Sequence, residues 1–445
     1  MTGALTTAWV SIDPLQRTWR LHLPPGRVPH ALALSKKLTI RLGNWKKTLT
    51  VTQKRPSAAV IQSRIRIHPQ SGSTPSIGPF VGILTVAGKG LFRGVQSNFI
   101  DIIEAGRKFG ALIYVIPVEN IDWKTLTVRG YLYHKTSNKW VKETLPMPHV
   151  MYNRIPNRAY EEQEHVKAAL DRLAALPQIT LYNPHFFNKR RLFTTLQRDP
   201  NVSSYLPQTV PLLSRESLFH MLDSHALVYA KPVNGMAGKG IYRLQKRSRT
   251  DFVLQYQLKK STVTQMFTSR DMLWNFLSPR LTGPYLIQQG IHLATFHNKL
   301  FDIRLLAQKN GHGEWGVTGI GIRLAGSGRI TTHVPRGGSI QSPSVIFPTA
   351  FPRSSPTELL KSIRRVALTI AHSLEKEWPT LGEVSMDIGI DKQERIWFIE
   401  ANSKPGKFDE PHIRKLSLRR TIEYAQYQSR FIHSKGGLRR VHTQP

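Results

Sequence analysis

Two strand-like runs near the end of the sequence, Val384–Ile390 and Arg395–Asn402, carry acidic and amide side chains suited to metal binding. The polar stretch 391–394 between them predicts a β-hairpin. Glu400 and Asn402 are two residues apart, so in a strand their side chains point to the same face. Both side-chain oxygens can then reach one cation.

Asp387 joins this face only if the two strands pair in one particular register. With Ile390 opposite Arg395, Asp387 lies opposite Phe398 and has Glu400 as a diagonal neighbour, whereas a one-residue slip would send it to the other face. Two carboxylates and an amide oxygen then suit Mg²⁺ or Mn²⁺ that bridges nucleotide phosphates. The alternative is a solvated hairpin face, in a chain with only 28 acidic residues.

A glycine-rich loop after a lysine provides a candidate phosphate site. An apolar run ends at Lys231, and the following loop contains Gly235, Gly238 and Gly240 before another strand-like run. Glycines let backbone N–H groups approach phosphate oxygens closely, and the lysine adds a point charge. The loop is not a P-loop, because the lysine after Gly238 is followed by glycine instead of Ser or Thr. An ordinary hairpin turn is the alternative.

The elements that must position these residues follow from hydrophobic periodicity. Apolar runs at 81–86 and 111–116 flank helical spacing over 98–109, which is a βαβ pattern, and a further helix is expected over 161–175. Later in the chain, a serine and a proline begin an amphipathic helix over 355–374 that is expected to cover a sheet.

The N-terminal part shows short alternating segments separated by Pro, Gly and Ser, which predicts a β-rich module, and the stretch 69–79 has the composition of a linker. The predicted organisation has four parts: a β-rich N-terminal module (1–75), an α/β domain (80–180), a larger α+β domain (181–430) and a basic C-terminal tail (431–445).

Composition limits the classes of function. The 445 residues suit two or three domains. The absence of cysteine excludes disulfides and thiolate metal sites, so oxygen or imidazole must hold any metal. No apolar run is long enough for a membrane span and no secretory leader is evident, so a cytosolic location is expected. The net charge of +35 attracts phosphate-rich or carboxylate-rich partners, but the basic residues are scattered through the whole chain.

The order of these segments resembles that of ATP-grasp enzymes. It includes the D-I-R run Asp302–Arg304, an R-G-G run that begins at Arg336, and the E-A-N-S-K-P-G run Glu400–Gly406. The branch that ligates glutamate to ribosomal protein is similar, and the whole chain resembles the YheC/YheD family of endospore coat-associated proteins. The resemblance implies an α+β ATP-grasp fold, with two α+β subdomains clasping ATP, preceded by an α/β pre-ATP-grasp domain and the β-rich N-terminal module.

The resemblance also implies roles for individual residues. The lysines would contact phosphates, the glycine loop would close over them, the hinge segment would recognise adenine, and the arginines would bind the transferred phosphate. The implied nucleotide-binding residues are Lys189, Lys231, Gly235, Gly238, Gly240, Gln288, Gln289, Ile291 and Asp302, the catalytic residues are Arg304, Arg323 and Arg336, and the metal ligands are Asp387, Glu400 and Asn402.

Several of these residues have simpler interpretations. Lys189 could lie at a solvated helix start, Arg323 and Arg336 could be surface charges, and Asp302 could be a turn or salt-bridge residue. Many members of the superfamily have an acidic residue at one of the hinge positions that glutamines occupy here. A glutamine carbonyl can still accept a hydrogen bond from an amino group, which keeps adenine binding feasible.

The implied activity is ATP-dependent ligation through an acyl-phosphate, with ATP and Mg²⁺ or Mn²⁺ required. The positive charge favours an anionic carboxylate substrate or polymer, and the family's association implies spore coat proteins as partners and a coat-associated location. One alternative is a structural coat-associated protein that binds ATP without turnover. Another is a nucleic-acid-binding protein, which the charge alone favours, since no zinc finger, helix-turn-helix or aromatic-basic RNA motif is present.

Overall fold

The structure is a computed structural model that describes residues 5–23, 35–68, 74–233, 239–258, 261–325 and 339–432. Contacts between residues divide the chain into two compact units. Unit 1 comprises Met1–His185, Gln308–Glu314 and Gly406–Pro445, and unit 2 comprises Phe186–Ala307 and Trp315–Pro405. The last helix therefore belongs by its contacts to unit 1, although the sequence pattern placed residues up to 430 with the larger α+β domain.

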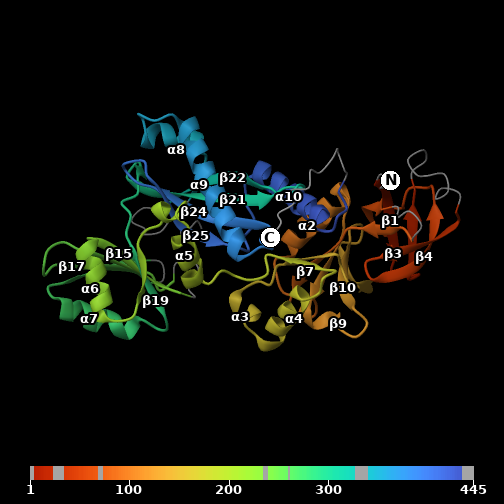
Figure 1. Cartoon of the computed structure of the whole chain (residues 1–445), viewed down its shortest axis with the longest axis horizontal. Helices are drawn as coiled ribbons and strands as arrows, with labels where there is room; N and C mark the ends of the chain where they lie inside the picture. Colours follow the sequence, from red (N-terminus) through yellow and green to blue (C-terminus); the bar gives the residue numbers. More distant parts are fainter. Residues whose placement is uncertain are drawn as a thin grey trace, which may run out of the picture. The chain divides into compact units, whose positions relative to one another are not determined.

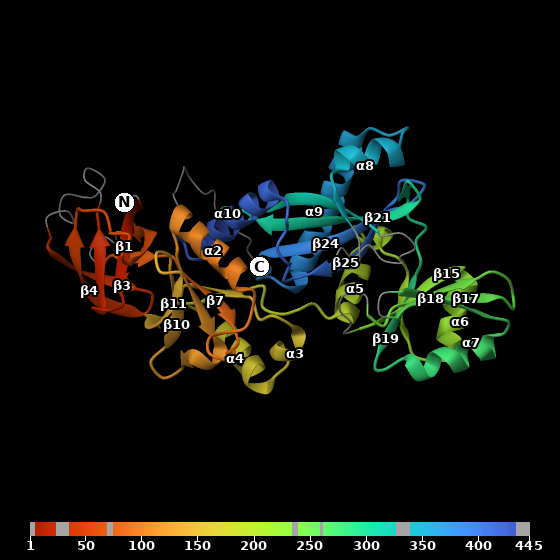
Figure 2. The ribbon, with the colours of Figure 1, turned by 180° about the vertical axis from the view of Figure 1, so that it is seen from behind.

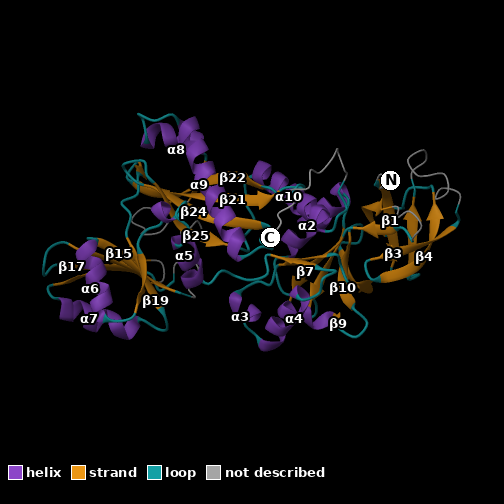
Figure 3. Ribbon diagram, viewed as in Figure 1, coloured by secondary structure: helices purple, strands orange, loops and turns teal. Residues whose placement is uncertain are grey.

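The N-terminal module is a closed β-barrel with the strand order β1-β2-β4-β3-β6-β5. Figure 3 shows its strands, with β1, β3 and β4 labelled. Alternating apolar residues such as Ile61, Ile65 and Ile67 fill its core. This confirms the β-rich prediction, but the linker prediction is wrong for β6, which pairs with β3 and β5; residues 69–73 lie outside the described residues. The strands are β1 (Thr6–Asp13), β2 (Thr18–His22), β3 (Lys37–Leu42), β4 (Trp45–Thr52), β5 (Ile61–His68) and β6 (Ser76–Gly78).

The second part of unit 1 is an α/β sheet in the order β11-β10-β8-β7-β12-β13, with β9 paired to β10. Parallel β7 and β8 flank α2, which confirms the predicted βαβ unit. The elements are β7 (Phe80–Thr85), α2 (Gln96–Phe109), β8 (Leu112–Pro117), β9 (Ile121–Asp122), β10 (Thr127–His134), β11 (Lys139–Pro146), β12 (Val150–Asn153), α3 (Arg158–Glu161), α4 (Glu164–Ala174) and β13 (Thr180–Tyr182).

Two helices of unit 1 differ from the sequence prediction. The helix expected over 161–175 is α4, which begins only at Glu164 because Gln163 has an extended backbone conformation, and the short helix α3 precedes it. The C-terminal helix α10 (Pro411–Gln428) packs against α2, as Figures 1 and 2 both show. A guanidinium nitrogen of Arg414 lies 2.8 Å from a carboxylate oxygen of Asp101, so a partly buried ion pair joins the two helices.

Unit 2 contains two sheets, and the first has the order β14-β19-β15-β16-β17-β18. Helices α6 and α7 cover one face with Leu218, Leu222, Leu273 and Leu277 (Figure 1). Antiparallel pairing of β15 and β16 confirms the predicted strand, loop and strand around the glycines. The elements are α5 (Lys189–Gln197), β14 (Thr209–Leu212), α6 (Arg215–Ser224), β15 (Leu227–Pro232), β16 (Tyr242–Lys246), β17 (Phe252–Leu258), β18 (Ser261–Phe267), α7 (Arg270–Leu277) and β19 (Tyr285–Gln289).

The second sheet of unit 2 has the order β23-β22-β21-β24-β25, with β20 paired to β21. The predicted amphipathic helix is α9, which begins with Pro356 and buries Ile363, Val366, Ile370 and Leu374 in the core shared with this sheet. The elements are β20 (Thr295–Phe296), β21 (Lys299–Lys309), β22 (Trp315–Leu324), β23 (Ser339–Gln341), α8 (Pro343–Ala350), α9 (Pro356–Glu377), β24 (Glu383–Ile390) and β25 (Ile396–Asn402).

Each sheet of unit 2 thus carries its own helices and its own apolar core, which gives two α+β subdomains. Within the described ranges, no helix has the length and apolar composition needed to span a membrane.

Candidate active site

The β24–β25 hairpin forms as predicted, but its register differs. Ile390 pairs with Ile396 instead of Arg395, so the expected register is wrong by one residue. The cause lies in the turn, where the buried Asp391 accepts hydrogen bonds from the backbone N–H groups of Gln393 and Arg395, each at 2.9 Å. Trp397 donates a further bond to the same carboxylate. Because of these bonds, Arg395 belongs to the turn and not to the paired part of β25, so the strand pairing begins at Ile396.

A β-bulge compensates for this one-residue difference in register and keeps Asp387 on the same face as Glu400. Ile388 pairs with Phe398, whereas Asp387 pairs with Glu400, so Ile399 is the extra residue on β25. Asp387 therefore lies directly opposite Glu400, and their side chains share one face of the hairpin.

A fourth polar residue belongs to the same face. Ser385 lies opposite Asn402, two residues before Asp387 on β24. Its hydroxyl is buried and has no hydrogen-bond partner among the residues that the structure describes. The sequence reasoning missed Ser385, although its spacing from Asp387 is the same as that of Glu400 from Asn402.

Two arginines from the neighbouring strands hold Asp387. Arg304 on β21 donates to one carboxylate oxygen at 2.6 Å, and Arg323 on β22 lies 2.8 Å from the other. Burial alone would raise the pKa of Asp387, but attraction first to Arg304 and then to Arg323, with their hydrogen bonds, lowers it below its usual value. Asp387 is therefore an ionised carboxylate at neutral pH.

Asp302 extends this cluster of charges. It is 6% exposed and accepts two hydrogen bonds from Arg323, at 2.8 Å to Nε and 2.7 Å to Nη2. Arg323 thus bridges two buried aspartates, and their attraction raises the pKa of its guanidinium despite burial. Asp302 is a salt-bridge residue in this structure, and its expected contact with the nucleotide remains a prediction. We call Asp302, Arg304, Arg323 and Asp387 the buried charge cluster.

Lysines from two other elements lie close to the hairpin face. Lys189 is the first residue of α5, which Asn188 caps, and its Nζ lies 3.7 Å from Glu400 Oε1 with only 15% of the side chain exposed. Burial, and then repulsion from Lys189, lower the pKa of Lys231 to about 8, although Glu400 and Asp387 oppose the shift. Two cations and two carboxylates therefore share one region of unit 2.

The expected adenine-binding side chains contact their own sheet. Lys231 Nζ donates to Gln288 Oε1 at 2.5 Å, and Gln288 Nε2 donates to Thr209 Oγ1 at 2.9 Å. The Gln289 carbonyl accepts from the backbone N–H of Gln208 at 3.1 Å. Ile291 follows β19 in the segment that leads to the second sheet, and its backbone carbonyl accepts a hydrogen bond from Leu293 at 3.0 Å. Sequence reasoning did not single out Thr209.

The glycine loop is described only in part. Gly240 has a φ of +72°, a conformation that favours glycine, and a Cβ atom there would lie 3.0 Å from the hydroxyl of Tyr285. Gly235, Gly238 and Arg336 lie outside the described residues, so their roles stay predictions.

The donor set fits a hard divalent cation. Asp387, Glu400, Asn402 and Ser385 each offer a side-chain oxygen, the ligand that Mg²⁺ prefers. Among the described residues, no group of three or more histidine or acidic side chains is placed to hold a metal. The candidate site thus has two carboxylates, an amide and a hydroxyl, and both oxygens of Asp387 already contact arginines.

Two α+β subdomains, one carrying a lysine before a glycine loop and the other a hairpin with paired acidic residues, define an ATP-grasp fold. The YheC/D-like ATP-grasp family model matches residues 178–427, more than half of the chain, so the protein belongs to this family.

Two curated relatives support the same assignment. The chain is 34% identical over 372 residues to the endospore coat-associated protein YheD of Bacillus subtilis, which covers 80% of each protein. It is 22% identical over 329 residues to YheC of the same organism, which covers 73% of this chain and 89% of YheC.

Among solved structures, the ATP-grasp ligase PsnB complexed with a minimal precursor matches with 11% identity and a TM-score of 0.44, over 79% of this chain and 99% of PsnB. The D-cycloserine synthetase DcsG matches with 12% identity and a TM-score of 0.45, over 78% and 99%.

Proposed function

We propose that this protein is an ATP-dependent ligase that activates a substrate carboxylate. The observation that carries the proposal is the direct pairing of Asp387 with Glu400 on one hairpin face, beside Lys189 and the Lys231 strand end. Closely spaced carboxylates and lysines of this kind suit Mg²⁺ together with a polyphosphate, because the carboxylates attract the cation and the lysines attract the phosphate oxygens.

The chain's residues would divide the binding between them. Asp387, Glu400 and Asn402 would hold Mg²⁺, which when bound neutralises charge on the nucleotide phosphates. Lys189, Lys231 and the glycine loop would contact those phosphates. The segment around Gln288 and Ile291 would bind adenine, through backbone groups if the Gln288 side chain keeps its contacts with Lys231 and Thr209.

Arg304 and Arg323 would position and stabilise the transferred phosphoryl group, together with Arg336. In the first step a carboxylate oxygen of the substrate attacks the γ-phosphorus, the bond to the β,γ-bridging oxygen breaks, and ADP leaves. In the second step an amine or other nucleophile attacks the acyl carbon and gives up a proton to solvent, and phosphate leaves with the electron pair of the C–O bond. The arginines suit this work because their planar groups bind two oxygens at once.

The substrate class follows from charge. With a net charge of +35, the protein attracts anionic carboxylate substrates or polymers. The curated relatives are named endospore coat-associated, so coat proteins are the partners we propose, and a coat-associated location follows.

A second candidate is a coat-associated protein that binds ATP without turnover. Two sets of contacts favour it. In the buried charge cluster both oxygens of Asp387 already contact arginines, and outside that cluster the Gln288 side chain already contacts Lys231. Catalysis would require these contacts to be exchanged for metal and nucleotide.

Release of ADP distinguishes the two candidates. Mg²⁺-ATP binding is first measured by calorimetry, and ADP release is then measured with a panel of free and peptide-borne carboxylates plus amine acceptors. The ligase proposal predicts ADP release only with a matching carboxylate, and its loss in Arg304→Gln. Binding of ATP with no ADP release under any pair of substrates would contradict the ligase and favour the second candidate.

A further inference from the structure

A cavity of about 520 Å³ lies in unit 1, between the β-barrel and the α/β sheet. Its volume is in the range of natural ligand pockets. One wall comes from β1, β5 and the loop before β5, and the other from the last turns of α2 and the turn between β10 and β11. The lining residues are Trp9, Ala58, Val60, Gln62, Glu104, Arg107, Lys108, Lys135 and Thr136. We call it the barrel pocket.

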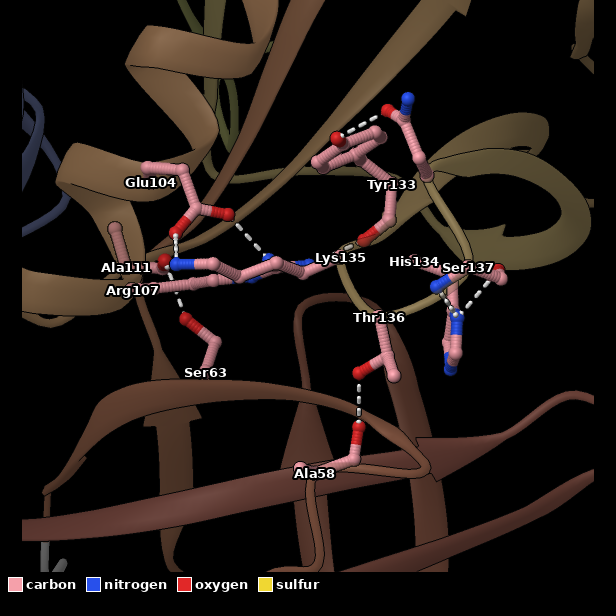
Figure 4. A network of polar contacts seen from close by, with 11 residues as sticks. Ala58, Ser63, Glu104, Arg107, Ala111, Tyr133, His134, Lys135, Thr136 and Ser137 are labelled. Atoms are coloured by element: carbon pink, nitrogen blue, oxygen red, sulfur yellow. Dashed lines mark hydrogen bonds and ion pairs between the residues drawn. The ribbon is translucent and has the colours of Figure 1, made fainter.

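Hydrogen bonds across the two domains hold the walls of the barrel pocket in place. Thr136 donates through Oγ1 to the Ala58 carbonyl at 2.6 Å, and His134 Nε2 lies 3.0 Å from the Ala59 carbonyl oxygen. Ser63 on β5 donates to the carbonyl of Ala111 at 2.7 Å. Figure 4 shows the Thr136–Ala58 and Ser63–Ala111 bonds. The pocket is therefore preformed, which lowers the entropic cost of binding a ligand.

The barrel pocket is strongly positive. Glu104 contacts both Arg107, at 2.5 Å, and Lys135, at 2.9 Å, as Figure 4 shows. Lys108 is exposed and adds a charge that Glu104 does not neutralise. Arg64 lies over the Trp9 ring, with its guanidinium carbon 5.6 Å from the ring centroid. Among the described lining residues, Arg107, Lys108 and Lys135 thus outnumber the single carboxylate of Glu104, and Arg64 adds a further positive charge beside Trp9, so an anionic ligand is favoured.

The other lining groups favour an acidic peptide over a nucleic acid as the anionic ligand. The Trp9 ring and the side chains of Ala58 and Val60 form an apolar wall, which suits an apolar side chain. Gln62 and Thr136 carry oxygens able to accept hydrogen bonds from N–H donors. A peptide backbone supplies such donors, whereas a phosphodiester backbone supplies none. Single-stranded nucleic acid is also bound on several successive aromatic platforms, whereas Trp9 is the one aromatic residue among the described residues that line this pocket.

We propose that the barrel pocket binds an acidic peptide segment, with its carboxylates against Lys108, Lys135 and the neighbouring arginines and an apolar side chain against Trp9. The binding partner is therefore a polypeptide rich in glutamate or aspartate. This site does not depend on the proposed ligase activity, because none of its residues belongs to unit 2.

The test uses the full chain and a fluorescein-labelled peptide, Glu-Glu-Phe-Glu-Glu-Phe, with binding followed by fluorescence anisotropy. We expect Lys108→Glu/Lys135→Glu to weaken binding by at least about tenfold, because two attractions become repulsions. The matched control is Lys124→Glu/Lys167→Glu, which reverses two exposed lysines elsewhere in unit 1 and should change affinity by less than about twofold.

A gain-of-function variant keeps the proposal falsifiable if the double variant folds poorly. Glu104→Gln removes the one carboxylate among the described lining residues, so the peptide should bind a few times more tightly. Trp9→Ala should weaken binding of this peptide but not of one with alanine in place of phenylalanine.

Two results would overturn the proposal. Equal losses in the pocket variant and the matched control would mean that the general positive charge binds the peptide. Tighter binding of a single-stranded DNA oligonucleotide, lost in the pocket variant but kept in the control, would assign the pocket to nucleic acid.

Discussion

Two clusters of charged side chains in this protein differ in their balance of charge and in their exposure to solvent. The buried charge cluster in unit 2 pairs two aspartates with two arginines at distances of 2.6 to 2.8 Å, with side chains at most 23% exposed. The cluster around Glu104 in the barrel pocket sets several cations against one carboxylate, and the Lys135 side chain is 71% exposed.

The difference suits the two clusters to different tasks: the buried charge cluster holds side chains in fixed positions, and the barrel pocket attracts a ligand. Buried ions without partners are costly, so the cluster in unit 2 must stay balanced, and its members are fixed in place by one another. Such fixed charges suit the transfer of a negatively charged phosphoryl group, the reaction proposed for this site. At the barrel pocket, the exposed Lys108 and Lys135 keep positive charge in contact with water, which costs little and leaves that charge available to attract a ligand.

The largest effect expected from this comparison is on stability, from Asp387→Asn. The substitution leaves Arg304 and Arg323 without their shared carboxylate, and we expect a loss of about 3–5 kcal/mol in the free energy of unfolding. Urea unfolding measures it. The control is Asp271→Asn, an exposed partner of Arg215, which should cost less than about 1 kcal/mol. Similar small losses in both variants would mean that the buried charge cluster is not tightly formed.

Asp302→Asn should have an intermediate effect. It removes a charged acceptor from Arg323, but Arg323 keeps its contact with Asp387. We expect a loss of roughly 1.5–3 kcal/mol, the usual contribution of hydrogen bonds to charged groups. The same unfolding experiment measures it, and a loss larger than that of Asp387→Asn would reverse the assigned order of the two aspartates.

Nucleotide affinity should depend on pH through Lys231. Its pKa is lowered to about 8, so the ammonium is charged below pH 8 and loses its charge as the pH rises through this value. Between pH 7 and 9, ATP affinity should fall by up to about tenfold, as the charged fraction does. Lys231→Arg stays charged and should give a flat profile in calorimetric titrations. An equally steep fall in Lys231→Arg would exclude Lys231 as the group that titrates.

The smallest effect is expected for Glu104→Gln. It removes the contacts with Arg107 and Lys135, but the lysine is exposed and Arg107 keeps a hydrogen bond to the carbonyl of Tyr133. We expect a change of less than about 1 kcal/mol in unfolding free energy. A loss of several kcal/mol would show that this cluster is also structural, and would remove the contrast between the two clusters.

The sequence was sufficient for the elements with strong periodicity. The βαβ unit around α2, the helix α9 and both strands of the β24–β25 hairpin were predicted because apolar residues recur at helical or strand spacing. The register was not predictable, since the capping of the turn by Asp391 and the bulge at Ile399 depend on hydrogen bonds that no pattern of apolar residues encodes.

Other features depend on contacts between residues far apart in the sequence. The pairing of Arg323 with both Asp302 and Asp387 joins three strands, and the contact of Lys231 with Gln288 joins two, so neither follows from local spacing. The packing of α10 against α2 joins Arg414 to Asp101, which are 313 residues apart in the sequence, and local composition cannot indicate such a contact.

The central claim is that the paired carboxylates of the β24–β25 hairpin hold the metal of an Mg²⁺-ATP site. Isothermal titration of Mg²⁺-ATP into the wild-type protein, Glu400→Gln and the control Glu358→Gln tests it most directly, because Glu358 is an exposed residue of α9 that pairs only with Lys361 in the described contacts. We predict binding to the wild type and to Glu358→Gln, and a loss of at least about tenfold in Glu400→Gln, as expected for loss of a metal ligand. Unchanged affinity in Glu400→Gln would contradict the account.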